Sequence, residues 1–305
     1  MGTPDFAVPT LDALLTLPTV TVVAVITAPD RPAGRGRQVQ VSAVKAAALA
    51  HGLPVLQPER LKAPEFVAEL RGYAADLQVV VAFRMLPEVV WNMPRLGSVN
   101  IHASLLPQYR GAAPINWALI QGETETGVTS FFLRHEIDTG DLIMQDRVAI
   151  APADDFGSLY DKLKGAGAAL AARTVAAIAA GQAPSTPQPP TTAGLRPAPK
   201  LTRETGQLDF RQPAAALVNL VRGLSPAPGA HTTLPDGRAL KVFRAAVGTA
   251  TDVADADAPG TWVSDGRRYL SVATPGGWLD LLDLQLEGKK RLPVAEFLRG
   301  NKLTL

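Results

Sequence analysis

Six prolines fall within residues 184–199, and this stretch separates two parts of the chain that have different sequence patterns. Proline lacks a backbone N–H and fixes φ, so neither a helix nor a central strand can run through the stretch. An extended linker that keeps two folded bodies apart is the simplest interpretation. The chain has 305 residues, which exceeds the size at which a single hydrophobic core usually stops growing. We therefore predict two domains, residues 1–183 and 200–305, joined by a proline-rich linker over residues 184–199.

Segments typical of strands and of helices alternate through the first part of the chain. Short apolar or β-branched runs predict strands at residues 20–26, 77–82, 99–102, 128–133 and 142–150. Capped or alanine-rich segments predict helices at residues 3–17, 41–51, 114–121 and 158–181. This alternation is typical of an α/β fold with a doubly wound, mostly parallel sheet, and such folds bind their ligands at the carboxyl ends of the strands.

The pattern after residue 200 changes to short strands separated by turns. Strands are predicted at residues 241–246, 260–263, 269–274 and 278–284, with turns at 235–237 and 275–277. Helices are predicted at residues 214–224 and 294–299. We predict a second, smaller domain of the β-barrel type, similar to an OB fold.

The composition limits the chemistry and the compartment. Hydrophobic residues make up 47% and charged residues 19% of the chain, which is ordinary for a globular protein. Cysteine is absent, which excludes disulfides, thiolate metal sites and cysteine nucleophiles and fits a reducing cytosol. No run approaches the roughly 18 apolar residues of a membrane span, and the first residues do not resemble a signal peptide. We expect a monomeric, cytoplasmic enzyme with no membrane partner.

Two segments, residues 100–111 and 135–141, supply an amide, an imidazole and a carboxylate in Asn100, His102 and Asp138. An amide N–H can hold a carbonyl oxygen, an imidazole can move a proton or stabilise an oxyanion, and a carboxylate can orient the imidazole and accept a proton. Acyl or formyl transfer uses all three roles. Asp138 follows His102 by 36 residues (138 − 102), so only folding can bring them together. Taken alone, an Asn-x-His pair is more often structural, and a lone Asp in a loop is more often a turn residue or a cap.

Several motifs occur together along the chain: Ala33–Arg37, Asn100–His102, Ser104–Pro107, Tyr109–Ile115 and Asp138–Asp141. This combination resembles the methionyl-tRNA formyltransferase family over nearly the whole chain, including the linker and the smaller second domain. The resemblance implies transfer of a formyl group from 10-formyltetrahydrofolate to the methionine amine of charged initiator tRNA. It also implies a doubly wound first domain and a barrel-like second domain that binds tRNA.

By motif position, the resemblance assigns the catalytic roles to Asn100, His102 and Asp138. It assigns the folate contacts to four consecutive residues: Ser104, Leu105, Leu106 and Pro107. Packing of a strand end is an equally simple interpretation of the Leu-Leu-Pro sequence, and the two roles can coexist. No compact spacing of histidines indicates a metal site, so we expect no metal.

Two groups of basic residues could contact the tRNA backbone. Arg35 and Arg37 alternate with glycines in a short loop, and in relatives the corresponding loop enters the acceptor-stem region. Lys289, Lys290 and Arg291 form the clearest basic cluster of the second domain. Either group could instead be solvated surface charge, and the salt dependence of tRNA binding would separate the two interpretations.

The start of the sequence departs from the family pattern. Family members normally begin with a hydrophobic strand directly before the Gly-Thr-Pro-Asp-Phe turn, whereas this sequence has only Met1 before Gly2. Because the first strand is an interior one, its absence would leave neighbouring N–H and C=O groups unpaired. We expect translation to begin upstream of Met1. The segment Phe83–Pro87 also departs from relatives, which leaves the details of the folate pocket open.

Two other functions remain open at this point. The predicted trio indicates a reaction more directly than a substrate, so the amine could belong to another acceptor, such as a sugar nucleotide. A catalytically inactive RNA-binding relative is the third hypothesis, although the retained amide, imidazole and carboxylate argue against it. Activity with charged tRNA would discriminate among all three.

Overall fold

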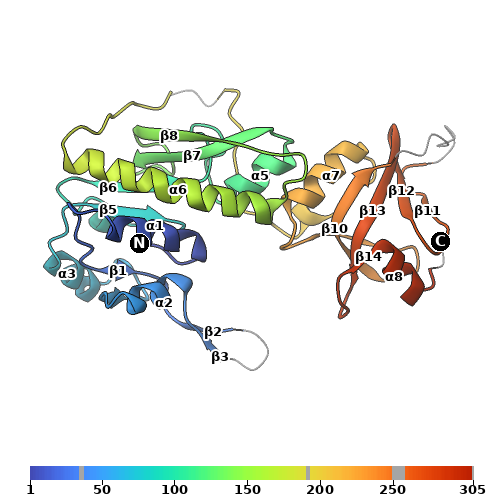
Figure 1. The fold of residues 1–305 in the computed structure, drawn as a ribbon, viewed down its shortest axis with the longest axis horizontal. Coiled ribbons are helices and arrows are strands. Elements are labelled where there is room, and N and C mark those ends of the chain that lie inside the picture. Colours follow the sequence, from blue (N-terminus) through green and yellow to red (C-terminus); the bar gives the residue numbers. More distant parts are fainter. Residues whose placement is uncertain (34–37, 190–192, 249–257, 304–305) are drawn as a thin grey trace. The chain divides into compact units, whose positions relative to one another are not determined.

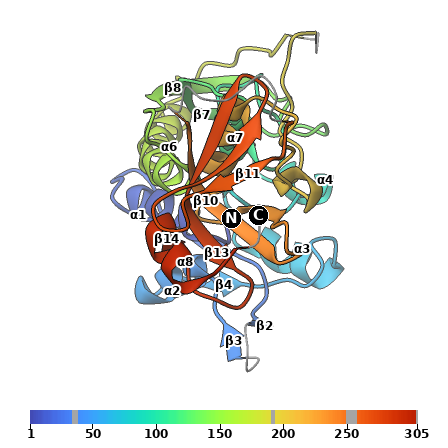
Figure 2. The same ribbon diagram turned by 90° about the vertical axis from the view of Figure 1, so that its right-hand side faces the viewer.

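The computed structural model describes residues 1–33, 38–189, 193–248 and 258–303 (Figures 1 and 2). These residues form two compact units, each assembled from separate stretches of chain. Unit 1 comprises Met1–Gly111, Glu125–Ala149 and Tyr160–Pro197, and unit 2 comprises Ala112–Thr124, Ile150–Leu159 and Ala198–Leu305. Two short stretches from within the predicted first domain, Ala112–Thr124 and Ile150–Leu159, therefore pack within unit 2. The two predicted domains, residues 1–183 and 200–305, are each continuous in sequence. That these two parts fold independently remains a prediction.

The central sheet of unit 1 has the strand order β5 (Gln78–Val81), β6 (Ser98–His102), β7 (Glu125–Phe132) and β8 (Leu142–Ala149). β5 and β6 run parallel, as predicted, whereas β7 runs antiparallel to both β6 and β8. The alternation of strands and helices did not predict this reversal. The connection from β6 to β7 carries α5 (Pro114–Ile120), which packs against α7 (Ala214–Gly223) within unit 2. It is therefore not a crossover helix that returns the chain to a parallel neighbour.

One long helix, α6 (Phe156–Ala179), lies across one face of this sheet (Figure 1). Ile178 of this helix packs with Val99 of β6 and Ile143 of β8. The other elements that surround the sheets of unit 1 are η1 (Asp5–Ala7), α1 (Val8–Leu15), β2 (Arg31–Ala33), β3 (Gln38–Gln40), α2 (Ala43–Ala50), α3 (Pro64–Gly72) and α4 (Glu88–Trp91). Across the described ranges, no helix has the length and apolarity that a membrane crossing requires.

The first two residues connect the central sheet to a second pair of strands. β1 (Val25–Ile26) pairs in parallel with β4 (Val55–Leu56). Gly2 N donates a hydrogen bond to β1 at 3.1 Å, and Met1 O accepts one from β5 at 2.9 Å. Of the strand predicted at residues 20–26, only the last two residues are regular.

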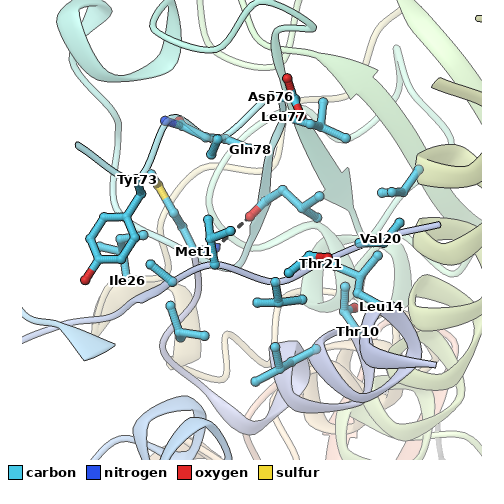
Figure 3. Close-up of a pocket in the computed structure, with 18 of the residues that line it drawn as sticks. Met1, Thr10, Leu14, Val20, Thr21, Ile26, Tyr73, Asp76, Leu77 and Gln78 are labelled. Carbon is cyan, nitrogen blue, oxygen red and sulfur yellow. Dashed lines mark hydrogen bonds between the residues drawn. The ribbon is translucent and has the colours of Figure 1, made fainter. Parts of the chain in front are cut away.

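A cavity of about 520 Å³ lies beside the chain start, with residues of the β1 and β5 segments in its walls (Figure 3). Its largely apolar lining includes Leu14, Val20, Ile26 and Leu77. Residues 20–24 line one wall, and no strand of the described chain pairs with them, so β1 is short. The lining contains none of the predicted catalytic or folate-binding residues, and the cavity is therefore not the candidate active site.

Unit 2 is built on an antiparallel sheet in the order β11-β12-β13-β10-β9, with β14 also paired to β13. The strands are β9 (Ala230–Thr233), β10 (Ala239–Val247), β11 (Trp262–Ser264), β12 (Leu270–Thr274), β13 (Gly277–Leu286) and β14 (Leu292–Pro293). α7 and α8 (Val294–Gly300) pack on this sheet, beside a 3-10 turn, η2 (Glu204–Gly206). The smaller β domain was predicted. Among the residues that the structure describes, no ladder joins the edge strands β9 and β11, and closure into a barrel remains a prediction.

The Met1 amine should make the stability of a chain that begins at this residue depend on pH. The amine donates to Val79 O at 2.6 Å (Figure 3), and burial lowers its pKa from 8.0 to about 5. Between these pH values the unfolded chain binds a proton that the folded chain lacks. The contribution of this amine to the free energy of unfolding should therefore rise with pH across this window, by up to about 4 kcal/mol, and stay constant outside it.

Denaturant unfolding measured across this pH range tests the prediction. The matched control is the Nα-acetylated chain, which keeps a donor N–H but has no titrating amine. The difference in unfolding free energy between the two chains removes the contributions of all other groups. Parallel pH profiles for the two chains would contradict the prediction.

Candidate active site

β6 presents Asn100 and His102 on one face of the sheet, because side chains alternate along a strand. The residues on either side of Asn100 face the other way. Val99 belongs to a core cluster with α6, and a Cβ placed on Gly167 of α6 would lie 3.4 Å from Ile101 Cγ2. Asn100 and His102 therefore point away from α6, at the carboxyl end of two parallel strands, where ligands of α/β sheets bind.

The structure brings His102 and Asp138 together. His102 Nδ1 lies 3.7 Å from Asp138 Oδ2, and the two residues are 7% and 8% exposed. The other ring nitrogen, Nε2, lies 2.9 Å from the carbonyl oxygen of Tyr109. Because a carbonyl oxygen only accepts, Nε2 carries the proton of this hydrogen bond. Both ring nitrogens thus face protein groups, and the imidazole lies between the two segments that the sequence singled out.

Asp138 lies in a turn and has a backbone conformation that is unfavourable for a residue other than glycine. Its φ of 56° lies in the left-handed region, which costs a residue other than glycine on the order of 1 to 3 kcal/mol. Its Oδ2 accepts a hydrogen bond from Gly111 N at 2.9 Å. The segment 100–111 therefore holds the carboxylate of the segment 135–141. Gly140 lets the turn pack closely, since a Cβ there would lie 1.6 Å from Phe132 O. The Asp-Thr-Gly-Asp motif therefore fixes one orientation of the Asp138 carboxylate.

Asn100 differs from the other two predicted catalytic residues, because its amide is available to a ligand. The residue is half-buried, and within the described ranges no protein group hydrogen-bonds its side chain. A half-buried amide of this kind can donate to a carbonyl oxygen and stabilise the negative charge that develops on it. The arrangement thus offers a free donor near an imidazole and an acid. The described residues contain no group of three or more His, Asp or Glu side chains that could hold a metal ion.

The predicted folate segment, residues 104–107, is anchored by a buried polar cluster that the sequence analysis missed. Thr129 of β7 donates from Oγ1 to Ser104 O at 2.6 Å and accepts from Leu106 N at 3.1 Å. Gln145 of β8 donates from Nε2 to Leu106 O at 2.8 Å. The only sequence signal for this cluster was a hydroxyl residue inside an apolar strand, since a buried hydroxyl needs a partner.

The four predicted folate residues differ in exposure. Ser104 is fully buried, and its hydroxyl donates to a backbone carbonyl oxygen at 2.7 Å. Leu106 is also buried, whereas Leu105 and Pro107 are half-buried. Leu105 packs against Gly127 of β7, where an added Cβ would lie 2.5 Å from Leu105 Cδ2. Leu105 and Pro107 are the two that retain surface for a ligand, and folate binding by this segment remains a prediction.

Two of the predicted tRNA contacts, Arg35 and Arg37, lie outside the described residues. In the sequence they fall between β2 and β3, an antiparallel pair that projects from the rest of unit 1 (Figures 1 and 2). A projecting position suits contact with a large partner. The role of both arginines remains a prediction.

The other predicted tRNA contacts, Lys289, Lys290 and Arg291, are exposed between β13 and β14 of unit 2. Arg291 Nη2 donates to Asp283 Oδ2 at 2.8 Å, and its guanidinium lies 4.9 Å from the centroid of the Phe243 ring. Neither lysine ammonium has a protein partner in the described part of the chain. The two lysines are therefore the freer candidates for phosphate contacts.

Comparison with known proteins identifies the family. Residues 1–175 match the family described as Formyl transferase, and residues 200–302 match Formyl transferase, C-terminal domain. The methionyl-tRNA formyltransferase of Bacteroides fragilis is 54% identical over 310 residues, which cover 100% of this chain and 94% of that protein. The chain belongs to the methionyl-tRNA formyltransferase family. The family resemblance that the motifs indicated is thus confirmed.

Solved structures with a similar fold include other formyltransferases. WlaRD, a sugar 3N-formyl transferase solved in the presence of dTDP and 5-N-formyl-THF, has a TM-score of 0.67 at 17% identity and covers 95% of this chain and 97% of its own. HypX from Aquifex aeolicus, solved with tetrahydrofolic acid, has a TM-score of 0.57 at 21% identity and covers 82% and 43%. At these identities the likeness shows the fold alone, and it supports the predicted α/β class with a smaller β domain.

Thr129→Val should destabilise the protein, because it removes the hydroxyl that satisfies Ser104 O and Leu106 N but keeps the β-branched shape. Leaving these buried groups without that partner should lower the free energy of unfolding by about 1 to 3 kcal/mol. Thr126→Val is the matched control in the same strand. Thr126 is 3% exposed, and its Oγ1 has no partner among the described residues, so the control should be neutral or stabilising. Equal losses in denaturant unfolding would show that the polar cluster contributes nothing.

Proposed function

We propose that this family member transfers a formyl group from 10-formyltetrahydrofolate to the α-amino group of methionine on initiator methionyl-tRNA. The observation that carries the proposal is the 54% identity to the Bacteroides fragilis methionyl-tRNA formyltransferase over 100% of this chain. The meeting of His102 and Asp138 beside a free Asn100 amide supports it. A folate donor is supported by the tetrahydrofolic acid in HypX, which shares the fold. We also expect the protein to act as a monomer in the cytoplasm.

The predicted trio can serve the chemistry of this transfer. The amine nitrogen attacks the formyl carbon, a C–N bond forms, and the formyl oxygen gains negative charge. The Asn100 amide donates to that oxygen. The amine loses one proton, which Asp138 and His102 accept as a pair through a water molecule. The bond from the carbon to the folate nitrogen then breaks, and that nitrogen leaves with one proton, so the exchange is balanced.

The acceptor amine distinguishes this proposal from its alternatives. Similarity to the sugar formyltransferase WlaRD is only 17% in sequence, whereas the methionyl-tRNA formyltransferase of Bacteroides fragilis matches at 54%. The test supplies purified protein with 10-formyltetrahydrofolate and three acceptors: initiator methionyl-tRNA, elongator methionyl-tRNA and an amine-bearing sugar nucleotide. Preferential formylation of the initiator species supports the proposal. Labelling of the sugar alone, or of no acceptor, would replace it with one of the two alternatives.

Asn100→Ala should slow formyl transfer by roughly two to three powers of ten, because one oxyanion donor is typically worth about 2.7 to 4 kcal/mol. Single-turnover kinetics isolate the chemical step from product release. Asn92→Ala, an exposed asparagine after α4, is the matched control and should keep the normal rate. A near-normal rate for Asn100→Ala would remove this residue from the mechanism.

Replacing Lys289 and Lys290 with glutamine should weaken tRNA binding. The slope of log affinity against log salt concentration is negative, and its magnitude should decrease by about one for each phosphate contact that is lost. Lys62→Gln combined with Arg71→Gln, at two exposed basic residues of unit 1, controls for the loss of two positive charges. If the double variant keeps the original salt slope, the two lysines are solvated surface charges.

A further inference from the structure

Gln188 of the proline-rich linker lies opposite the turn that carries Asp138. Leu142 of β8 and Thr186 of the linker exchange two backbone hydrogen bonds, at 2.8 and 2.9 Å, as an antiparallel bridge. In this antiparallel register Gln188, two residues after Thr186, lies opposite Gly140, two residues before Leu142. The linker thus pairs with the edge of the sheet at one bridge and places the Gln188 side chain at the turn.

The Gln188 amide joins the two segments of the candidate site. Its Nε2 donates to Asp138 O at 2.9 Å and to Gly140 O at 2.8 Å. Its Oε1 accepts from Arg110 Nε at 3.2 Å and from Arg110 Nη2 at 2.6 Å. Arg110 directly precedes Gly111, whose N–H holds the Asp138 carboxylate. The Gln188 amide therefore binds the backbone of the segment that carries Asp138 and the Arg110 guanidinium of the other segment.

We propose that Gln188 is a positioning residue for Asp138, and this inference rests on the function proposed above. Asp138 has a left-handed backbone, which persists only where its surroundings hold it. Gly111 holds its carboxylate, and Gln188 holds its carbonyl oxygen, so the residue is fixed at both ends. Only a glutamine-sized amide supplies two donors to carbonyl oxygens and an acceptor to a guanidinium. A glutamate keeps the acceptor but loses both donors.

The role predicts an effect on turnover more than on substrate binding. A shift of a reacting group by about 1 Å can cost on the order of 100-fold in rate. Gln188→Met keeps the length but removes every hydrogen bond, and it should lower kcat by about 10- to 100-fold while KM for both substrates changes little. Gln188→Glu should lose a similar factor, because its carboxylate would face two carbonyl oxygens. Gln182→Met, at an exposed glutamine before the linker, is the matched control and should keep normal kinetics.

A double-mutant cycle separates positioning from a general effect on folding. Formyl transfer is measured in single turnover for Asp138→Ala, Gln188→Met and the double variant. If Gln188 acts through Asp138, adding Gln188→Met to Asp138→Ala should change the residual rate by less than about 2-fold, so the two losses do not add. Gln188→Glu in the same background provides a second cycle should the methionine variant fold poorly.

The outcomes distinguish this inference from the proposed function. Equal losses from the Gln188 substitution with and without Asp138 would show that Gln188 supports the fold only. Normal kcat in Gln188→Met and Gln188→Glu, with a severe loss in Asp138→Ala, would overturn the inference and leave the proposed function standing. Full activity in Asp138→Ala would overturn the inference and the role of Asp138 in catalysis. The proposed function itself would fail only if the unaltered protein did not formylate initiator methionyl-tRNA.

Discussion

The hydrogen bond from Gly111 N to Asp138 Oδ2 is the contact on which the candidate site depends. A buried carboxylate must be paired or hydrogen-bonded, and a backbone N–H that donates to an ionised oxygen makes one of the stronger bonds available. Gly111 adopts a φ of 125°, a conformation that side chains rarely allow, so glycine is required where its N–H meets the acid. With this bond in place, His102 Nδ1 faces the same oxygen. The Tyr-Arg-Gly and Asp-Thr-Gly-Asp motifs are thus two halves of one contact.

The elements that the sequence predicted are those whose burial follows a local pattern. α6 and β13 lie close to where alanine-rich and apolar runs placed them, because periodic burial leaves a period in the sequence. Asn100 and His102 could be placed on one face for the same reason. The meeting of His102 with Asp138 could be expected only through motif resemblance, since 36 residues separate them (138 − 102) and no local pattern encodes their distance.

The features that the sequence did not predict depend on contacts between distant segments. α5 packs within unit 2, where Asn116 Nδ2 donates to Gly223 O at 2.8 Å and a Cβ on Gly223 would lie 2.6 Å from Ile120 Cγ1. Close approach of this kind needs one glycine at one position, and a single glycine gives no periodic signal. The same packing explains why β7 runs antiparallel to β6. Because α5 packs within unit 2, it does not act as the crossover helix that a parallel neighbour would need.

The proline-rich linker shows how composition can predict a path without predicting its function. Prolines exclude helix and central strand, and they lack the N–H that would let the linker pair continuously. The hydrogen bonds of the described linker include those made by the backbone of Thr186, Arg196 and Ala198 and by the side chains of Ser185 and Gln188. Prolines also reduce the freedom that an extended segment loses when it is ordered. Because the prolines keep the segment extended between these hydrogen bonds, a single side chain can be placed at a defined point, as the Gln188 amide is on the turn that bears Asp138.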